Sequence, residues 1–390
     1  MEDANLENNT GEIKDNRKKD NDTDDVGVNG NRINNDSVKD IQNQDNGKKD
    51  GLKKVKRMAK ADDIVISSRA RLARNIEGFP FPWKMSAEQG KRIFAMITEA
   101  LMTSTLGKEL LLVDSKDIGL IDKQFLVEKH LISPDMAESK KAGGAIISRD
   151  EKISVMVNEE DHLRIQCLFK GLDLKGAFAL CNRIDNLLEE KIEFAFNPSL
   201  GYITCCPTNL GTGLRASVML HLPALVITGL IKNILEACGQ LNLAVRGIYG
   251  ENSGASGNMF QISNQSTLGN TEEEAILSIT RVAIQIAEQE KNLRTELYKQ
   301  NPYRFEDRVM RSYGLFTHAR IISHEESMKL LSDIRVGVDM GIITTMSRDV
   351  LDELMILVQP AGLQKYCGRQ LSPEERDHRR AEIIRQKLDL

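Results

Sequence analysis

The sequence predicts an α+β fold, in which an antiparallel sheet flanked by helices is followed by an all-α C-terminal part. Two observations support this prediction. Short apolar runs at 145–147, 153–157 and 163–168 follow one another closely, as successive antiparallel strands do. After Pro302 the remaining apolar residues have helical spacing, and the last segment opens with a helix cap. We therefore expect a mixed sheet-and-helix domain and a separate helical domain.

The chain divides into three segments by composition. Residues 1–60 are rich in Asn, Asp, Lys and Gly and contain no aromatic residue, which predicts a disordered polar tail. The apolar run 64–66 marks the start of the folded part. We expect the α+β domain over 61–295 and the helical domain over 296–390.

The elements of the α+β domain follow from local patterns. Arg69 and Arg71 alternate after the first apolar run, so they would share one side of a strand. Thr271 precedes three glutamates, which predicts the start of a long helix ending near Gln300. The other elements expected are helices over 86–106, 115–130 and 173–190, a loop over 207–213, a helix start in 214–221, a strand over 244–248, a loop over 252–257 and a strand over 261–265.

The helical domain is predicted from spacing and caps. We expect helices over 303–313, 324–334, 347–358 and 373–388. Ser372, Pro373 and Glu375 open the last of these as cap, first-turn proline and capping-box acid.

Composition excludes some classes of partner and setting. The 390 residues carry a net charge of -4, which argues against bulk attraction to nucleic acid or an anionic membrane. The six cysteines have no paired spacing, and no apolar signal segment or span of about 20 apolar residues occurs. We therefore expect a reducing, cytoplasmic setting.

Five arginines form the candidate site: Arg69, Arg71, Arg164, Arg215 and Arg246. Each alone would be expected on the solvated surface. Together, beside Gly, Ser and carboxylate neighbours, they suit the neutralisation of phosphates, because the guanidinium is a planar fork of donors. No G-x-x-x-x-G-K-[ST] loop and no H-R-D or D-F-G set occurs, so the usual nucleotide folds are not indicated.

The segments Asn158–Arg164 and Cys206–Arg215 closely resemble the signature segments of the guanido kinases, the family of creatine and arginine kinases. The match is ordered and spans residues 63–293. The resemblance implies a guanido-kinase catalytic domain that uses ATP and Mg²⁺. The Mg²⁺ would be held mainly by phosphates and water, with no metal site made of side chains alone.

Within that family, the chain most resembles the branch of bacterial protein arginine kinases. A polar tail replaces the helical N-terminal domain of the small-molecule enzymes, and the helical region after residue 300 has no counterpart in them. A third feature that favours this branch is a segment that resembles its R-D-x-x-R-A motif, which forms an allosteric phosphoarginine pocket. The segment consists of Arg376, Asp377, His378, Arg379, Arg380 and Ala381. The alternative is a charged helix face, since Arg376 and Arg380 are four residues apart.

The resemblance assigns roles to the acids and one cysteine. Glu160 would align the guanidinium and act as general base, and Glu251 would be the second carboxylate that grips it. Cys206 matches the family's reactive cysteine and would tune the reaction without a covalent intermediate. Glu159 and Asp161 could pair with a local base or approach the Mg²⁺ shell through water.

The resemblance also assigns the nucleotide ligands. His130 is expected to contact the nucleotide, although a lone histidine is often structural. The backbone around 215–219 and 246–250 is expected to help hold the nucleotide. The complete expected set is Ser67, Ser68, Arg69, Ala70, Arg71, His130, Arg164, Arg215, Ala216, Ser217, Val218, Met219, Arg246, Gly247, Ile248, Tyr249, Gly250 and Glu251.

The function implied is transfer of the γ-phosphoryl group of ATP to arginine side chains of proteins, in cytoplasmic stress response and protein quality control. The partners implied are proteins with exposed arginine, an activator protein, Clp-type protease machinery and a second copy of the chain. Neither direct nucleic acid nor membrane binding is expected. The alternatives are a phosphagen kinase acting on free arginine or another small guanidine, and a catalytically silent phosphoarginine-binding adaptor. The polar tail argues against the first, and the presence of both glutamates and all five arginines argues against the second.

Overall fold

The computed structural model describes residues 64–139, 141–247 and 256–388. All of them lie in one compact unit, Lys49–Leu390. The predicted tail, 1–60, lies outside the described residues. So do the loop residues 252–255 and four of the expected site residues, Ile248, Tyr249, Gly250 and Glu251.

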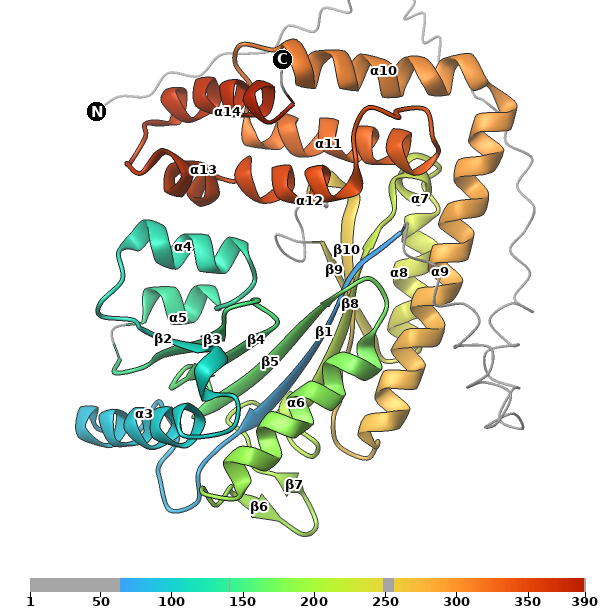
Figure 1. Ribbon diagram of the computed structural model, residues 1–390. Coiled ribbons are helices and arrows are strands. Elements are labelled where there is room, and N and C mark those ends of the chain that lie inside the picture. Colours follow the sequence, from blue (N-terminus) through green and yellow to red (C-terminus); the bar gives the residue numbers. More distant parts are fainter. Residues whose placement is uncertain (1–63, 140, 248–255, 389–390) are drawn as a thin grey trace, which may run out of the picture. The chain divides into compact units, whose positions relative to one another are not determined.

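The centre of the fold is an antiparallel sheet in which β1 (Val65–Arg74) is an inner strand (Figure 1). Among the described residues, eight strands pair in the order β2-β3-β4-β5-β1-β8-β10-β9. The others are β2 (Leu110–Asp114), β3 (Gly144–Ser148), β4 (Ile153–Val157), β5 (Leu163–Lys170), β8 (Leu214–His221), β9 (Leu243–Gly247) and β10 (Met259–Asn264). Because β1 pairs with β5 on one side and β8 on the other, side chains from three strands meet around it.

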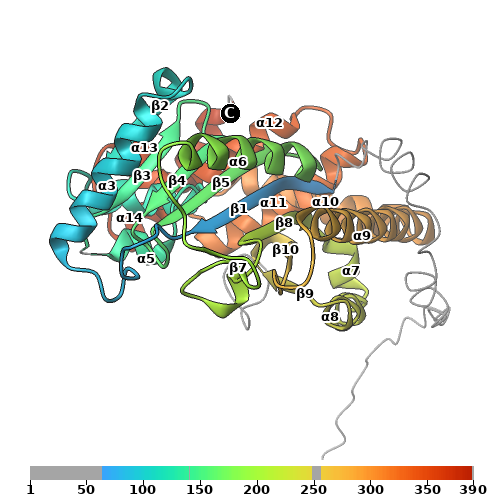
Figure 2. The same cartoon turned by 90° about the horizontal axis from the view of Figure 1, so that it is seen from below.

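Three long helices cover one face of the sheet: α3 (Ala87–Met102), α6 (Leu174–Glu189) and α9 (Glu272–Gln300). Figure 2 shows α6 lying along β5 and β1. Apolar residues of these helices pack against Ala70 and Leu72 of β1 and Ala216 and Val218 of β8 in a single core. Capping boxes begin α3 and α9, which explains why both starts were predictable.

The opposite face of the sheet carries shorter elements. Here α4 (Leu120–Glu128) and α5 (Pro134–Glu138) pack on β3 and β4 through a small apolar cluster. The cluster consists of Leu131, Ile132, Met136, Ala145, Ile147 and Met156. Two further helices, α7 (Pro223–Ile227) and α8 (Ile231–Gln240), pack into the same core as α3, α6 and α9. The strands β6 (Phe196–Asn197) and β7 (Gly201–Tyr202) form a separate two-stranded sheet.

The C-terminal part is helical and has apolar clusters of its own. Its helices are α10 (Pro302–His318), α11 (His324–Asp339), α12 (Arg348–Leu357), α13 (Pro360–Cys367) and α14 (Pro373–Lys387). In four of them, the side chain of an N-cap Asn or Ser accepts a backbone N–H three residues further on, which fixes where the helix begins. The predicted α+β class with an antiparallel sheet and a helical C-terminal part is confirmed.

One predicted element is wrong. We expected a helix to start in 214–221, but these residues form β8, which pairs with β1 and β10. Leu214, Ala216 and Val218 point into the core, and the residues between them point to the other face. Leu, Ala and Met have high helix propensity, but two ladders of backbone hydrogen bonds and burial outweigh that preference.

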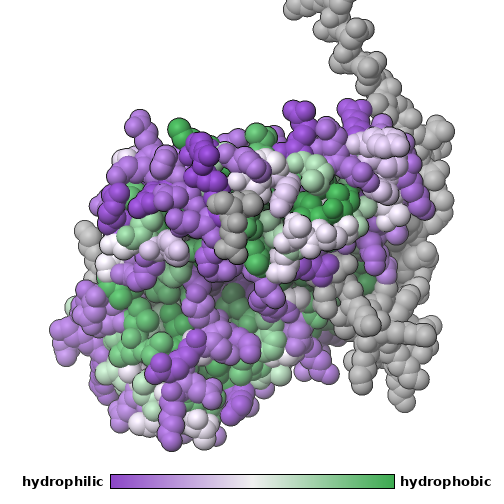
Figure 3. All heavy atoms as spheres, turned by 45° about the horizontal axis from the view of Figure 1, so that its top comes forward, coloured by the Kyte–Doolittle hydropathy of each residue, from purple (hydrophilic) through white to green (hydrophobic). Residues whose placement is uncertain are grey.

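The face of the molecule in Figure 3 carries both hydrophilic regions and hydrophobic patches. Exposed apolar side chains include Tyr303, Met310 and Leu315 on α10, and Leu111 and Leu112 on β2. No helix in the described ranges is long and apolar enough to cross a membrane.

A buried ionic network joins the end of β8 to the C-terminal helices. Arg294 of α9 donates from Nε to Glu290 at 2.7 Å, from Nη1 to Asp339 at 3.0 Å and from Nη2 to the carbonyl oxygen of His221 at 3.0 Å. Glu290 is fully buried and also accepts the first-turn amides of α7. The imidazole of His221 lies 2.8 Å from the hydroxyl of Ser332 in α11. One arginine therefore holds together three elements around the end of β8.

Replacing Arg294 by Leu should destabilise the protein by about 3–5 kcal/mol, because it removes the cation that pairs with the buried Glu290 and one of the cations that pair with the buried Asp339. Urea unfolding followed by circular dichroism measures the change. Lys170 is the matched control: its pairs with Asp349 and Asp352 are exposed, so Lys170→Ala should cost at most about 1 kcal/mol. An equal loss of unfolding free energy in both variants would contradict this role of Arg294.

Candidate active site

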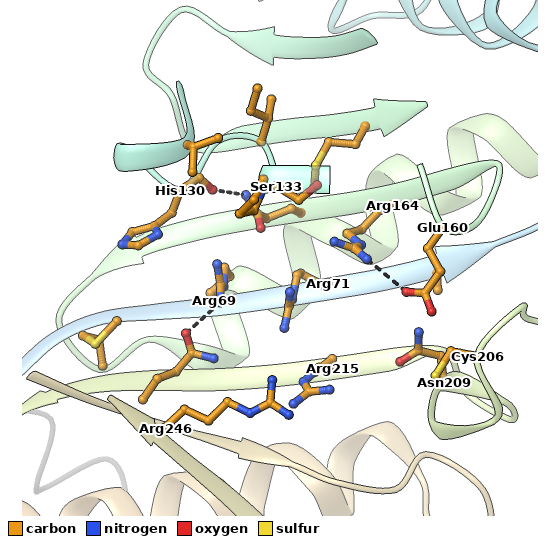
Figure 4. Close-up of a pocket in the computed structure, with 18 of the residues that line it drawn as sticks. Arg69, Arg71, His130, Ser133, Glu160, Arg164, Cys206, Asn209, Arg215 and Arg246 are labelled. Carbon is orange, nitrogen blue, oxygen red and sulfur yellow. Dashed lines mark hydrogen bonds and ion pairs between the residues drawn. The ribbon is translucent and has the colours of Figure 1, made fainter. Parts of the chain in front are cut away.

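A cavity of about 640 Å³ opens on the face of the sheet opposite α6 and α9. It is lined by all five predicted arginines, together with His130, Glu160, Cys206, Met219 and Gly247 of the predicted set. Figure 4 shows Glu160, Cys206 and Asn209 gathered at one end and His130 at the other, with the arginines between them. The cavity thus has an acidic end, a cationic middle and an end marked by an imidazole.

Strand alternation places the arginines on this face. Arg69 and Arg71 are two residues apart on β1, so both point into the cavity. Arg215 of β8 is directly paired with Arg71, and Arg164 of β5 is paired with Ala73. Arg246 comes from β9, the strand at the edge of the sheet. Four strands therefore bring five guanidinium groups together.

Hydrogen bonds to neutral side chains orient two of these arginines. Arg69 donates to the amide oxygen of Gln261 at 2.7 Å, and Arg215 donates to the hydroxyl of Ser263 at 3.3 Å. The Nε atoms of Arg71 and Arg215 are buried and have no hydrogen-bond partner in the protein. Donors without a partner in a cationic cavity indicate a site for an anion with several acceptor oxygens.

The cluster is electrostatically strained. Burial, with repulsion from Arg164 and Arg215, lowers the pKa of Arg69 to about 10. Burial and the charges of Arg69, Arg164 and Arg215 lower the pKa of Arg71 well below its ordinary value. Burial and neighbouring positive charges thus disfavour the charged forms of Arg69 and Arg71, so an anion bound beside them would be stabilised.

The side chain of His130 is exposed on the wall of the open cavity. Desolvation by the surrounding protein, with the nearby charges of Arg69 and Arg71, lowers its pKa to about 4. The imidazole is therefore neutral at neutral pH. Its backbone has a positive φ of 59°, and its carbonyl oxygen accepts a hydrogen bond from Gln166 at 2.6 Å. His130 thus offers a neutral ring on a backbone that is held to the sheet.

The acids of the first signature segment have separate environments. Glu159 is buried and pairs with Arg164 at 2.9 Å, and burial raises the pKa of its carboxyl. Glu160 is 40% exposed, lines the cavity and lies 3.3 Å from Arg164. Arg164 thus holds both acids, and only Glu160 is open to a ligand.

Asp161 and His162 position the loops at the acidic end. Asp161 accepts the backbone N–H of Cys205 and the amide N–H of Asn75, both at 2.7 Å. His162 accepts the backbone N–H of Ile76 at Nδ1, so its Nε2 carries the proton and donates to a backbone oxygen. These bonds tie the second signature segment to the first. Glu159 and Asp161 are therefore local structural partners in this structure.

Cys206 stands beside Glu160 at the acidic end of the cavity (Figure 4). Its sulfur lies 3.0 Å from the hydroxyl of Thr208. Cys205 points elsewhere, and burial together with Asp161 raises the pKa of its thiol. Of the two adjacent cysteines, only Cys206 lines the cavity.

Several predicted nucleotide ligands do not line the cavity. Ser68, Ala70, Ala216 and Val218 alternate with the arginines, so their side chains face the helices. The hydroxyl of Ser68, for example, donates to the carbonyl oxygen of Gly171 at 2.8 Å. Ser67 is also outside the lining, and Ser217 lies behind Arg69, 3.5 Å from its Nε.

The six residues Arg376–Ala381 lie on α14. Arg380 is buried, donating from Nε to the carbonyl oxygen of Val358 at 2.6 Å and from Nη1 to that of Ile322 at 2.9 Å. It also pairs with Asp377, while Arg379 pairs with Glu382. Arg380 is therefore part of the packing between α14 and α12.

The sequence analysis missed cavity residues that have no charge signal. Gln166 and Gln261 lie on β5 and β10 with side chains on the arginine face, which strand alternation could have indicated. Ser133 and Gln359 come from a helix cap and from the C-terminal part. Nothing in the local sequence around Gln359 points to this cavity.

Comparisons with known proteins identify the family. A family model described as the ATP:guanido phosphotransferase C-terminal catalytic domain matches residues 92–293. A second, described as the Protein-arginine kinase McsB C-terminal domain, matches residues 302–390. The Protein-arginine kinase of Bacillus subtilis (strain 168) is 49% identical over 339 residues, which cover 86% of this chain and 93% of that protein. The chain belongs to the protein-arginine kinase family of ATP:guanido phosphotransferases.

Other members of this kinase family have similar sequence identity to this chain and similar coverage. The Protein-arginine kinase of Caldanaerobacter subterraneus subsp. tengcongensis is 49% identical over 329 residues, covering 84% of this chain and 97% of that protein. That of Geobacillus stearothermophilus is 49% identical over 328 residues, covering 84% and 90%.

Solved structures of guanidine kinases share the fold. A crystal structure of lombricine kinase has a TM-score of 0.54 and 25% identity, covering 60% of this chain and 68% of that one. The duplicated taurocyamine kinase from Schistosoma mansoni, with bound transition state analog components, has a TM-score of 0.53 and 29% identity. That match covers 60% of this chain and 34% of that one.

The residues present fit the nucleotide of an ATP-dependent kinase. Five guanidinium groups, two with unpartnered buried donors, suit the oxygens of a triphosphate. The described residues contain no cluster of three or more Asp, Glu, His or Cys that could hold a metal ion.

Replacing Arg71 by Met should make the ligand-free kinase more stable, because it removes one of the repelling charges and keeps the apolar stem. A gain of about 1 kcal/mol would raise the melting temperature by about 2–4 °C, and the further rise on adding ATP should become smaller. Differential scanning fluorimetry with and without ATP measures both effects.

The matched control is Arg183→Met, since Arg183 is exposed on α6 and lies outside the cavity. It should change neither temperature. A lower melting temperature of ligand-free Arg71→Met, with the ATP effect intact, would show that Arg71 has a structural role instead.

Proposed function

We propose that this kinase transfers the γ-phosphoryl group of ATP to arginine side chains of proteins, with Glu160 as the group that binds and deprotonates the guanidinium. The observation that carries the proposal is the exposed carboxylate of Glu160 at one end of a cavity that, among the described residues, is lined by five arginines. A cationic middle suits the phosphates, and an acid at the end suits a guanidinium, which has only donors. The printed names of the relatives support protein arginine as the acceptor.

The chemistry follows from this arrangement. The guanidinium donates N–H to Glu160, and the carboxylate takes one proton as the nitrogen attacks the γ-phosphorus. The new N–P bond forms as the bond from the γ-phosphorus to the β–γ bridging oxygen breaks. ADP leaves with the electron pair of that bond, and the products are phosphoarginine, ADP and a proton. Mg²⁺, when bound, would neutralise charge on the phosphate oxygens.

The residues around the reacting atoms have positioning roles. Arg164 fixes Glu160 and leaves the rest of the carboxylate open to the acceptor. Arg71 and Arg215, paired across β1 and β8, lie in the middle of the cavity, where they would stabilise charge on the transferring group. Cys206 stands beside the guanidinium site and tunes it without a covalent bond. Glu251, the expected second carboxylate, lies outside the described residues.

The wider role of this kinase is also a proposal. The resemblance supports substrates with exposed arginine, an activator protein, Clp-type protease machinery, a homodimer, and a role in stress response and protein quality control. It also supports a phosphoarginine pocket around Arg376–Ala381. The absence of disulfides among the six cysteines supports a reducing, cytoplasmic setting.

The test is mass spectrometry of an arginine-rich protein after incubation with the kinase, ATP and Mg²⁺, with free arginine in parallel. We expect acid-labile adducts with the mass of one phosphoryl group on protein arginines. Phosphorylation of free arginine alone would identify a small-molecule guanidine kinase instead. Absence of both products, with ATP bound, would favour the adaptor alternative.

Replacing Glu160 by Gln should lower the transfer rate about 10²–10⁴-fold, because the amide cannot take the proton, and should leave ATP binding nearly unchanged. The transfer rate and the dissociation constant of ATP are measured side by side. Glu190→Gln, at an exposed position after α6, is the control and should change neither. A Glu160→Gln enzyme with full activity would remove Glu160 from the mechanism.

A further inference from the structure

A carboxylate of the catalytic part binds the start of a helix in the C-terminal part. Glu128, the last residue of α4, accepts the backbone N–H of Ala361 at Oε1 and that of Gly362 at Oε2, both at 2.7 Å. These two amides belong to the first turn of α13 and have no partner within the helix. The N-cap residue Gln359 does not cap them with its own side chain. A charge from a distant segment therefore caps α13.

The helix start that Glu128 binds is tightly packed. Gly362 is buried, and a Cβ at this position would collide with the backbone oxygen of Ile356. A side chain here would displace the amide that Glu128 binds. Burial raises the pKa of the Glu128 carboxyl, while the two amides and the charge of Arg380 oppose that rise. The charged form is thus stabilised by α13 and α14.

The segments on the two sides of this contact also line the cavity. Glu128 and His130 form part of its wall, and Gln359, one residue before α13, is another part. The backbone beside Glu128 is fixed to the sheet, because the carbonyl oxygens of His130 and Leu131 accept hydrogen bonds from Gln166 and Ser154. Segment 358–362 is therefore anchored to a rigid wall of the cavity.

The same segment is held from its other side by α14. Arg380 donates to the carbonyl oxygen of Val358 at 2.6 Å, one residue before Gln359. Glu128 thus binds the amides after Gln359, and Arg380 binds the carbonyl oxygen before it. The position of Gln359 in the cavity depends on both contacts.

The part of ATP that lies near His130 follows from the proposed function, on which this inference rests. The acceptor guanidinium lies at Glu160 and the phosphates lie among the arginines. The nucleoside then extends toward the opposite end, where His130 stands (Figure 4). A neutral imidazole and an amide side chain suit the hydrogen-bonding groups of a nucleoside, which carries no charge.

We propose that the helical C-terminal part completes the nucleotide site of this kinase through Gln359, and that Glu128 is the positioning residue that holds this wall in place. Gln359 contacts the nucleoside, and Glu128 acts on the nucleotide only through segment 358–362. By linkage, any change that shifts this segment changes ATP affinity, and bound ATP stabilises the segment by the same factor.

The test is the dissociation constant of ATP, measured by isothermal titration calorimetry on the full chain, together with kcat and KM for transfer. Glu128→Ala should weaken ATP binding and raise KM about 5–10-fold, the effect of losing about one hydrogen bond, and leave kcat at saturating ATP within about twofold. Gln359→Ala should give the same pattern. In the Gln359→Ala background, adding Glu128→Ala should have little further effect.

The control is Asp122→Asn, which removes an exposed ion pair with Lys365 between the same two helices, α4 and α13. It should leave ATP binding unchanged. Glu128→Gln keeps one acceptor oxygen, so its effect should be smaller than that of Glu128→Ala. If Glu128→Ala does not fold, Glu128→Gln and Gln359→Ala still test the proposal.

Unchanged ATP binding in the Gln359→Ala and Glu128→Gln variants would overturn the proposal. So would a Glu128→Ala effect of the same size with and without Gln359, since it would show a purely structural role. The calorimetric measurement requires no phosphoryl transfer. If the wild-type protein binds ATP but modifies no arginine, the proposed function fails while this inference is still tested.

Discussion

The repulsion among guanidinium groups on one face of the sheet is the constraint on which the rest of this structure depends. The backbone ladders of β1, β5, β8 and β9 hold five arginines on the same side of the sheet. Among the described residues, Glu159 and Glu160 balance part of this charge through Arg164. The positive charge of the arginines suits the cavity to an anion. Stability is thus lost where the function requires charge.

Such a cluster requires a rigid support, and the structure supplies it in three places. The apolar core beneath the sheet fixes β1 and β8 through residues that alternate with the arginines. Arg294 and its partners fix the end of β8 against the C-terminal helices. Asp161 fixes the loop that carries Cys206. Bonds between site residues, such as Arg69 to Gln261 and Arg164 to Glu160, then fix the side chains on these supports.

Much of the fold was predictable because local signals agree with tertiary structure. Thr271 with its glutamates begins α9, and Arg69 and Arg71 share a face because strand alternation requires it. The sheet position of 214–221 was not predictable, since its residues favour helix in isolation and only pairing with β1 and β10 decides their structure.

The charged residues of the site were predictable from the sequence, whereas the contacts that depend on tertiary structure were not. The two signature segments indicated Glu160, Arg164 and Arg215, and the arginine pattern outside them indicated Arg69, Arg71 and Arg246. Strand alternation turns Ser68, Ala70, Ala216 and Val218 away from the cavity. The Glu128 contact with α13 joins residues far apart in the chain through backbone amides. Backbone amides carry no sequence signal, so only the folded structure shows this contact.

The central claim is that the arginine face binds the phosphates while Glu160 binds the acceptor guanidinium. The most direct test is a crystal structure with ADP, Mg²⁺, nitrate and an arginine-containing peptide, in which planar nitrate replaces the transferring phosphoryl group. We predict the phosphates and nitrate among Arg69, Arg71, Arg164, Arg215 and Arg246, and the peptide guanidinium against Glu160. A nucleotide bound elsewhere, or a guanidinium away from Glu160, would contradict the account.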